Sequence, residues 1–249
     1  MQSLDRACAL LELLSRADDG LPVSEFSRQM RLPMTSVHRF LKALETNGFV
    51  EQDSKTRLYR LGAGVLKLAS RFLNANRLIG VARAPMQMAA ESLGKVVYIS
   101  QRHVNDVVCI ACVDSTEGPQ AKFAAQIGYD MPFHAAAAAK IIFAYEPDSV
   151  IRAIVSRAGG VTKFTDKTKT TVKAILEDAR KNREQGYAVC DEELEPGVIA
   201  VAAPIYSYNG SVLASVAVTG IKANTDMPVL IKTVCQCGQT ISRAMGYVG

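Results

Sequence analysis

The chain has 249 residues, of which 49% are hydrophobic, so it can form one large domain or two modest ones with a buried core. No apolar run approaches the roughly 20 residues that cross a bilayer, and the N-terminal stretch lacks the pattern of a signal peptide. We therefore expect a cytoplasmic protein that does not associate with a membrane, and its six cysteines, which have no framework spacing, are expected to be reduced thiols.

The net charge of +5 arises entirely ahead of residue 85. Residues 62–84 hold four basic residues and no acidic one, whereas residues 85–249 hold sixteen of each. A basic first third in front of a neutral remainder is typical of a DNA-binding head on a neutral body.

The first sixty residues have the periodicities of three helices and a hairpin. Regularly spaced leucines give residues 4–16 one apolar face, and Asp18-Asp19-Gly20 ends that helix. Ser24 is the expected N-cap of the second helix, which Leu32-Pro33 ends. Residues 49–52 and 57–61 flank a polar turn and form the hairpin, so the segment is predicted to be a winged helix.

The third helix, which ends at Gly48, is predicted to lie in the major groove of DNA. Its apolar residues recur at positions i, i+3, i+4 and i+7, and Thr35 or Ser36 is expected to cap its start. Between Arg31 and Leu44 there are basic residues and no carboxylate. Such a surface suits phosphates and base edges. The predicted DNA-binding residues are Thr35, Ser36, His38, Arg39 and Lys42 on the helix, and Lys55 and Arg57 on the wing.

Each half of this prediction has an alternative. The helix can be a basic, solvated helix in an unrelated bundle, because helix-turn-helix patterns recur in all-α regions. Lys55 and Arg57 can serve only to keep the turn soluble.

Residues 63–84 are predicted to form a linker helix after the boundary glycines Gly62 and Gly64. Its apolar face, between Val65 and Leu73, needs a partner, which is either the chain's own body or a second subunit. DNA readers of this kind usually bind two half-sites as dimers.

From residue 96 the apolar pattern takes the period of strands. Asn105-Asp106 and Asn209-Gly210 are hairpin signals, and residues 122–128 are predicted to form a further strand. Helices are expected around Pro85 and over 134–145, 147–157, 170–185 and 227–245. Strands in hairpins with helices segregated around them predict an α+β fold with a mainly antiparallel sheet. The predicted division is a head at 1–62, a linker at 63–84 and an effector domain at 85–249.

Residues 183–220, REQGYAVCDEELEPGVIAVAAPIYSYNGSVLASVAVTG, closely resemble the signature of the isocitrate-lyase-regulator (IclR) family of bacterial transcription factors. The block GYDMPFHAAAAAKIIFA and the segment SVHRFLKALETNGFVEQ resemble two other parts of that family. The resemblance covers nearly the whole chain. It implies a winged helix-turn-helix, a linker helix and a GAF-like effector domain. It also implies a homodimer or a dimer of dimers that binds double-stranded operator DNA, more often as a repressor, and responds to a small organic or aromatic acid.

The resemblance maps an effector pocket onto one face of the C-terminal sheet. An alanine-rich helix start with free backbone N–H groups suits a carboxylate, and strand residues two apart share a face. Where the family often has Thr-Ala-x-Gly-Lys, this chain has Ala136–Lys140, and Ala217 and Thr219 stand where serines are common. The less polar pocket favours a larger, partly aromatic acid. The predicted effector-binding residues are Phe123, Met131, Ala137, Ala138, Cys190, Asp191, Ala217 and Thr219.

Two alternatives apply to these residues. The alanines can be close-packed core residues, and the acidic run 191–193 can be either a solvated turn or the source of one carboxylate that faces the pocket.

Patterns for catalysis and metal binding are weak. The sequence has no serine elbow, phosphate loop or paired-carboxylate spacing, so we expect neither enzymatic activity nor a cofactor, and His134 is assigned a capping or packing role. Cys109 and Cys112, three apart on a predicted strand, are expected to point to opposite faces, which argues against a metal site. A metal- or thiol-based sensor and a small-molecule enzyme are the alternatives to a regulator of the kind described.

Overall fold

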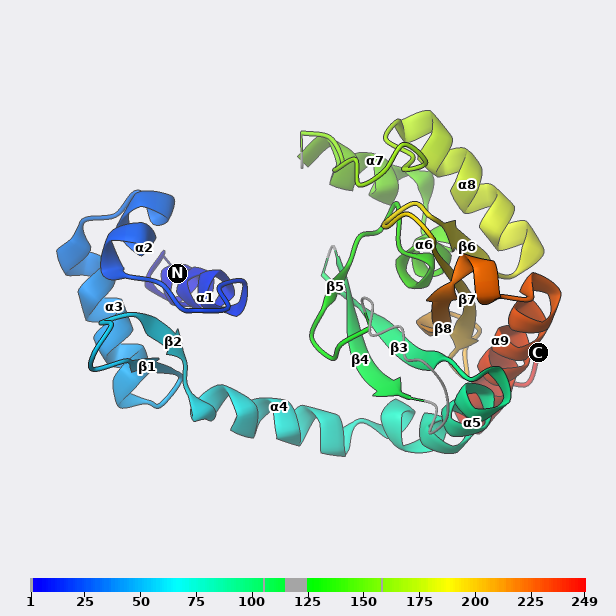
Figure 1. Cartoon of the computed structure of the whole chain (residues 1–249), viewed down its shortest axis with the longest axis horizontal. Coiled ribbons are helices and arrows are strands. Elements are labelled where there is room, and N and C mark those ends of the chain that lie inside the picture. Colours follow the sequence, from blue (N-terminus) through cyan, green and yellow to red (C-terminus); the bar gives the residue numbers. More distant parts are fainter. Residues whose placement is uncertain (1, 105, 115–124, 158) are drawn as a thin grey trace. The chain divides into compact units, whose positions relative to one another are not determined.

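The computed structural model describes residues 2–104, 106–114, 125–157 and 159–249. The chain divides into two compact units, Met1–Asn76 and Arg77–Gly249, each with its own core (Figure 1). Within the described ranges, no helix combines the length and the apolarity that a membrane crossing demands.

The first unit is a winged helix-turn-helix with one additional helix. Its elements are α1 (Gln2–Ser15), α2 (Val23–Met30), α3 (Met34–Thr46), β1 (Val50–Gln52), β2 (Tyr59–Leu61) and α4 (Ala63–Ala75). The two strands pair antiparallel, with Glu51 opposite Arg60. Apolar side chains from α1, α2, α3 and both strands form the core, whereas α4 buries none of its residues.

The helix starts differ from those predicted. α2 begins after Pro22 and α3 after Pro33, and neither has a side-chain cap. Ser24, Thr35 and Ser36 therefore lie inside first turns, and their predicted capping roles are wrong. The reason is that proline lacks only an N–H that the first turn does not need, so a helix can start directly behind it.

The end of α3 follows the prediction. Gly48 has a φ of +74°, a conformation that glycine adopts without a steric cost. Its N–H donates to the Glu45 carbonyl at 2.9 Å, and the Phe49 N–H donates to the Leu44 carbonyl at 2.9 Å. These two bonds form a Schellman motif, which satisfies the last carbonyls of the helix.

The second unit is an antiparallel sheet between two layers of helices. Its helices are α5 (Arg77–Leu93), α6 (Ala137–Ala144), α7 (Asp148–Arg157), α8 (Val172–Gln185), α9 (Met227–Ala244) and a short 3₁₀ turn (Lys222–Asn224). Its strands are β3 (Val96–His103), β4 (Asp106–Val113), β5 (Asp130–Met131), β6 (Ala188–Asp191), β7 (Val198–Tyr206) and β8 (Val212–Ile221). The strand order in the described residues is β5-β4-β3-β8-β7-β6, and every pair is antiparallel.

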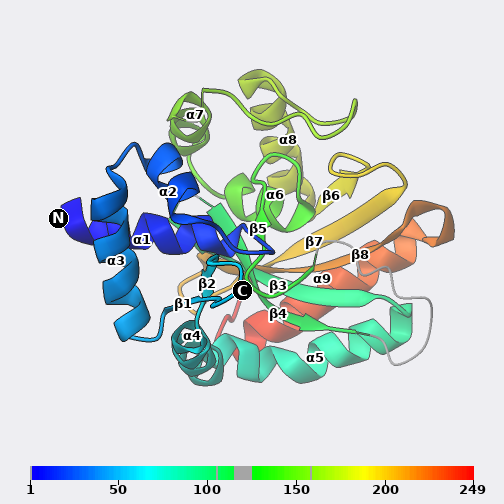
Figure 2. The same ribbon diagram turned by 60° about the vertical axis from the view of Figure 1, so that its left-hand side comes forward.

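The two faces of this sheet carry separate cores. α5 and α9 pack on one face, and α6, α7 and α8 cover the other (Figure 2). The predicted mixture of helices with a mainly antiparallel sheet is confirmed.

Two predicted elements are placed differently. The described part of the predicted strand 122–128, residues 125–128, is not a strand, and the short β5 follows it instead. The predicted linker 63–84 covers all of α4 and the first half of α5, with a break at Asn76.

Candidate DNA-binding surface and effector site

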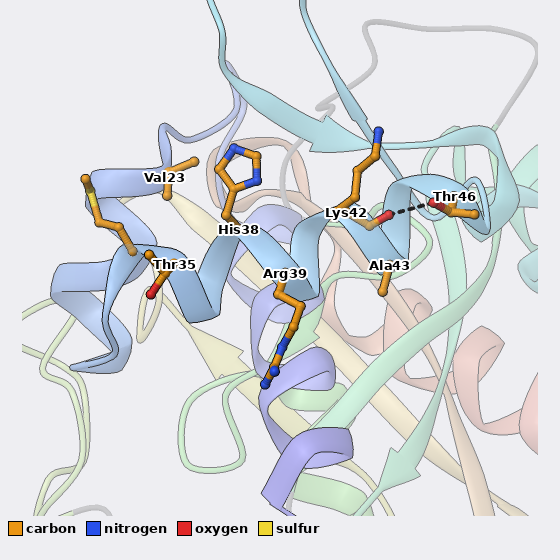
Figure 3. Close-up of a pocket in the computed structure, with 8 residues that line it drawn as sticks. Val23, Thr35, His38, Arg39, Lys42, Ala43 and Thr46 are labelled. Atoms are coloured by element: carbon orange, nitrogen blue, oxygen red, sulfur yellow. Dashed lines mark hydrogen bonds between the residues drawn. The ribbon is translucent and has the colours of Figure 1, made fainter.

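One face of α3 is open to solvent along most of its length. An open hollow of about 710 Å³ runs along this face (Figure 3). The opposite face buries Val37 and Leu41 completely. The residues that line the hollow are Val23, Met34, Thr35, His38, Arg39, Lys42, Ala43 and Thr46.

The structure brings four of the five residues predicted on this helix to the hollow. They are Thr35, His38, Arg39 and Lys42, and Figure 3 shows His38 and Lys42 leaving one side of α3 while Arg39 leaves the other. Ser36 does not line the hollow and is half-buried. Met34 lines it too, although the helical periodicity did not single it out, because an apolar residue in a first turn is usually assigned to the core.

The two cations of this face differ in how they are held. The Lys42 Nζ lies 2.9 Å from a carboxylate oxygen of Glu45, and this hydrogen bond raises the pKa of Lys42. The Arg39 guanidinium carbon lies 5.8 Å from the centroid of the Phe40 ring, and Arg39 has no ion pair among the described residues. Arg39 therefore offers an uncompensated charge to a phosphate.

The wing is a tight turn organised by Asp53. Its carboxylate accepts hydrogen bonds from the backbone N–H groups of Thr56 at 2.7 Å and Lys55 at 2.9 Å, and these bonds lower the pKa of Asp53. Arg57 has a φ of +62°, which is uncommon for a residue other than glycine. Lys55 and Arg57 are both exposed at this tip, as the sequence predicted.

In the second unit, strand register places small and polar residues beneath α6. On β8, Ser215 is fully buried and its hydroxyl donates to the Ala138 carbonyl at 2.8 Å, which fixes α6 on the sheet. Ala217, two residues further, lies opposite Ala202 of β7 and Tyr98 of β3. Tyr98 also lies on this face of the sheet beneath α6, and the sequence analysis did not single it out.

Most of the predicted effector residues share this face. Met131, Ala137, Ala138, Cys190 and Ala217 belong to one buried cluster. Thr219 follows Ala217 by two positions, so strand alternation places it on the same side. It is 5% exposed, and its hydroxyl donates to the Ile199 carbonyl at 3.4 Å. Phe123 lies outside the described residues.

Asp191 does not join this group. It follows Cys190 directly on β6, so the pleat turns its side chain toward the other face of the sheet. There its carboxylate lies 2.6 Å from the Lys222 Nζ. The acidic residue that does turn inward is Glu193, which is 4% exposed.

Glu193 belongs to a buried ion cluster behind α6. The Lys140 Nζ lies 2.6 Å from Glu193, 2.9 Å from Asp178 on α8, and 2.7 Å from the Val189 carbonyl, to which it donates. The Lys169 Nζ lies 3.1 Å from Glu193 and 3.2 Å from Asp178. Lys140 therefore ties α6 to α8 and to both ends of the segment that holds Cys190.

The start of α6 has the geometry expected of an anion site. Its N-cap residue is Ala136, and no side chain caps it. Among the described residues, the backbone N–H groups of Ala137 and Ala138 have no acceptor. All eight residues of α6 are buried, so these donors lie in a largely apolar surrounding, which strengthens their attraction for a carboxylate.

The prediction that Cys109 and Cys112 point to opposite faces is wrong. The register between β3 and β4 shifts by one residue near Ile99 and Ser100, so a bulge in β4 brings both thiols to the α6 side. Burial raises the pKa of Cys109 to about 12 and that of Cys112 to about 11. Thiols of this kind are protonated and poorly reactive. No set of three or more potential metal-ligating His, Cys, Asp or Glu side chains lies together in the ranges that the structure describes.

Two family models match the chain. Residues 70–243 match the C-terminal domain of the bacterial transcriptional regulator IclR, and residues 3–54 match the IclR helix-turn-helix domain. The chain is similar to the HTH-type transcriptional repressor AllR of Salmonella typhi, with 29% identity over 220 residues, 88% of this chain and 79% of the relative. It is also similar to the glycerol operon regulatory protein of Streptomyces coelicolor, with 29% identity over 251 residues, 99% of this chain and 97% of the relative.

Solved structures share the fold. A crystal structure of an IclR-type regulator from a Silicibacter species matches with a TM-score of 0.86 at 22% identity, over 99% of this chain and 97% of that one. An IclR homologue from Microbacterium hydrocarbonoxydans, crystallised with 4-hydroxybenzoate, matches with a TM-score of 0.80 at 21% identity, over 98% of both chains. At this level of identity the likeness concerns the fold.

Proposed function

Because the chain belongs to the IclR family of bacterial transcriptional regulators, we propose that it represses a catabolic operon until a small organic or aromatic acid binds its second unit. It is a DNA-binding regulator, and its similarity to a transcriptional repressor and to an operon regulatory protein supports this proposal. Binding to the chromosome would place it in the cytoplasm. We propose no catalytic reaction and no cofactor for it.

The open face of α3 is the observation that carries the proposal. Its first turn, from Thr35 to His38, lies toward base edges in the major groove, and Arg39 and Lys42 bind flanking phosphates. Lys55 and Arg57 on the wing bind the backbone or the minor groove. Ser36 is half-buried and lies on the side of this first turn that faces away from the hollow.

The effector binds at the start of α6. Its carboxylate accepts from the free N–H groups of Ala137 and Ala138, and Thr219 donates a further hydrogen bond. In this proposal Ala137, Ala138 and Ala217 face the ring of the effector, and Met131 and Cys190, which belong to the same buried cluster, border it. The homologue crystallised with 4-hydroxybenzoate supports an acid of this class. On this reading, residues 1–62 bind DNA, 63–84 link the units and 85–249 sense the effector.

A second copy of the chain completes the regulator. Leu66, Leu68 and Phe72 of α4 are 67%, 63% and 53% exposed, and no residue of this helix is buried. Pairing of α4 between subunits would cover these side chains and present two heads to a pseudo-palindromic operator. The assembly is a dimer or a dimer of dimers. The effector shifts the equilibrium between the DNA-competent and the incompetent arrangement of this assembly, because it binds the two with different affinities.

The test is a gel shift with the DNA that flanks the gene, using wild-type protein and Arg39→Ala. We expect a sharp shift for the wild type, a shift for the variant only at roughly 10- to 100-fold higher protein concentration, and release of the wild type by one member of a panel of aromatic and short-chain acids. A thermal-shift screen with the same acids reports binding independently of DNA. Wild-type operator affinity in Arg39→Ala would refute the assignment of α3.

A further inference from the structure

Met34 is an exposed apolar residue at the functional end of the recognition helix. It is the first residue of α3, its exposed fraction is 54%, and it lines the hollow along the helix. Its neighbour in that hollow, Val23 of α2, is half-buried. The hollow therefore has two apolar side chains, together with Thr35, at the end where the helix begins, while Arg39 and Lys42 lie further along it.

The DNA major groove offers one apolar group to such a surface. Each base pair presents hydrogen-bond donors and acceptors there, but only thymine adds a methyl group, at C5. In helix-turn-helix proteins the N-terminal residues of the recognition helix approach the base edges. The cations beyond Met34 match the phosphates on either side of the groove, so the charge pattern orients the helix with Met34 toward the bases.

We propose that Met34 is a specificity-determining residue that packs on the C5-methyl group of a thymine in each operator half-site. The proposal rests on the proposed function, because it requires α3 to lie in the major groove. Methionine suits the contact because its unbranched, polarizable side chain adapts to the groove edge. It brings no charge, so it adds nothing to the salt-dependent attraction for phosphates.

The test uses full-length protein and duplexes selected by the wild type from a random library. Each thymine of the selected half-site is replaced in turn by deoxyuridine, which removes only the methyl group. For one thymine per half-site we expect roughly a fourfold loss of affinity, the value of one buried methyl-sized group. In Met34→Ala the same replacement should have no effect, because the partner of the methyl group is gone.

Matched variants separate Met34 from its surroundings. Met34→Leu keeps an apolar side chain and should retain sensitivity to deoxyuridine. Thr35→Ser removes the neighbouring methyl group and should leave the sensitivity unchanged. Met88→Ala, at a methionine of α5 that is 71% exposed, should behave as the wild type. The slope of affinity against salt should be equal in the wild type and Met34→Ala.

Three results would overturn the inference. They are a selected duplex insensitive to deoxyuridine at every thymine, a sensitivity that persists in Met34→Ala, and a sensitivity that disappears in Thr35→Ser. Failure of the wild type to select any duplex would instead refute the proposed function, so the two failures are distinguishable.

Discussion

α3 and α6 begin alike but are buried to very different extents. In each, the first two backbone N–H groups lack an acceptor among the described residues, and the residue before the helix, Pro33 or Ala136, supplies no side-chain cap. α3 buries only two of its thirteen residues, whereas α6 buries all eight. The exposed helix α3 can carry charged side chains at little desolvation cost, and these side chains can contact a large partner. The buried helix can hold charge only in compensated pairs, so its free N–H groups suit a small ligand.

Two lysines sharpen this comparison. Lys42 on α3 and Lys140 on α6 lie at similar distances from their carboxylates, 2.9 Å from Glu45 and 2.6 Å from Glu193. The side chain of Lys42 is 70% exposed and that of Lys140 is 3% exposed. Water competes for the first pair, whereas Lys140 is buried beside Glu193 and the partly buried Asp178, where the partly exposed Lys169 is the second cation.

The largest expected effect follows from this difference. Lys140→Met leaves Asp178 and Glu193 without their central cation, and we expect a loss of about 3–5 kcal/mol in the free energy of unfolding. Urea denaturation followed by circular dichroism measures it. Lys42→Met is the matched control and should leave the midpoint of unfolding unchanged. Similar losses of stability in Lys140→Met and Lys42→Met would contradict the distinction between the buried and the exposed lysine.

The second largest effect concerns DNA affinity and not the stability of the fold. Arg39→Ala removes an exposed cation with no ion pair among the described residues, so the stability of the fold should not change. Operator affinity should fall roughly 10- to 100-fold, and the slope of log affinity against log salt should decrease by about one. Fluorescence anisotropy at several salt concentrations measures both. A clear loss of stability in Arg39→Ala would show that Arg39 stabilises the fold, which would contradict its assignment to DNA binding.

The sequence predicts most of the fold because the relevant signals are local. The apolar period of α3, the glycine at its end and the Asn209-Gly210 turn each act over a few residues. The open face of α3 follows directly from that period, since residues that are not in the apolar stripe must face away from the core.

The rest of the site depends on interactions across the sheet. The bulge that brings Cys109 and Cys112 to one face is set by pairing with β3, so counting alternate residues along β4 gives the wrong side. A run of three acids does not reveal which one turns inward. Glu193 turns inward because it forms ion pairs with Lys140 and Lys169, and both lysines are distant from it in sequence.

A smaller effect tests the ligand assignment of the buried face. Thr219→Val keeps the shape of the side chain and removes a hydroxyl whose present bond, 3.4 Å to the Ile199 carbonyl, is weak. We therefore expect little change in stability but roughly a fivefold weaker response to the effector, the value of one hydrogen bond. Calorimetry measures effector affinity, and gel shift checks that operator affinity is intact. Thr219→Ser should restore the response, and an unchanged response in the valine variant would remove Thr219 from the site.

The smallest effect is a pH dependence that separates His134 from His38. His134 is 5% exposed, its Nε2 donates to the Thr162 carbonyl at 2.8 Å, and burial lowers its pKa below the ordinary 6.5. The neutral ring is therefore favoured in the folded chain, and the unfolded chain binds the extra proton first as the pH falls. Stability should decrease below about pH 6.5 and continue to fall until the folded ring also titrates. His134→Gln should show a smaller decrease between pH 7 and 5 than the wild type, whereas His38→Gln, on the exposed face of α3, should show the same decrease. Equal curves for all three proteins would mean that the carboxylates, and not this buried ring, set the acid stability of the fold.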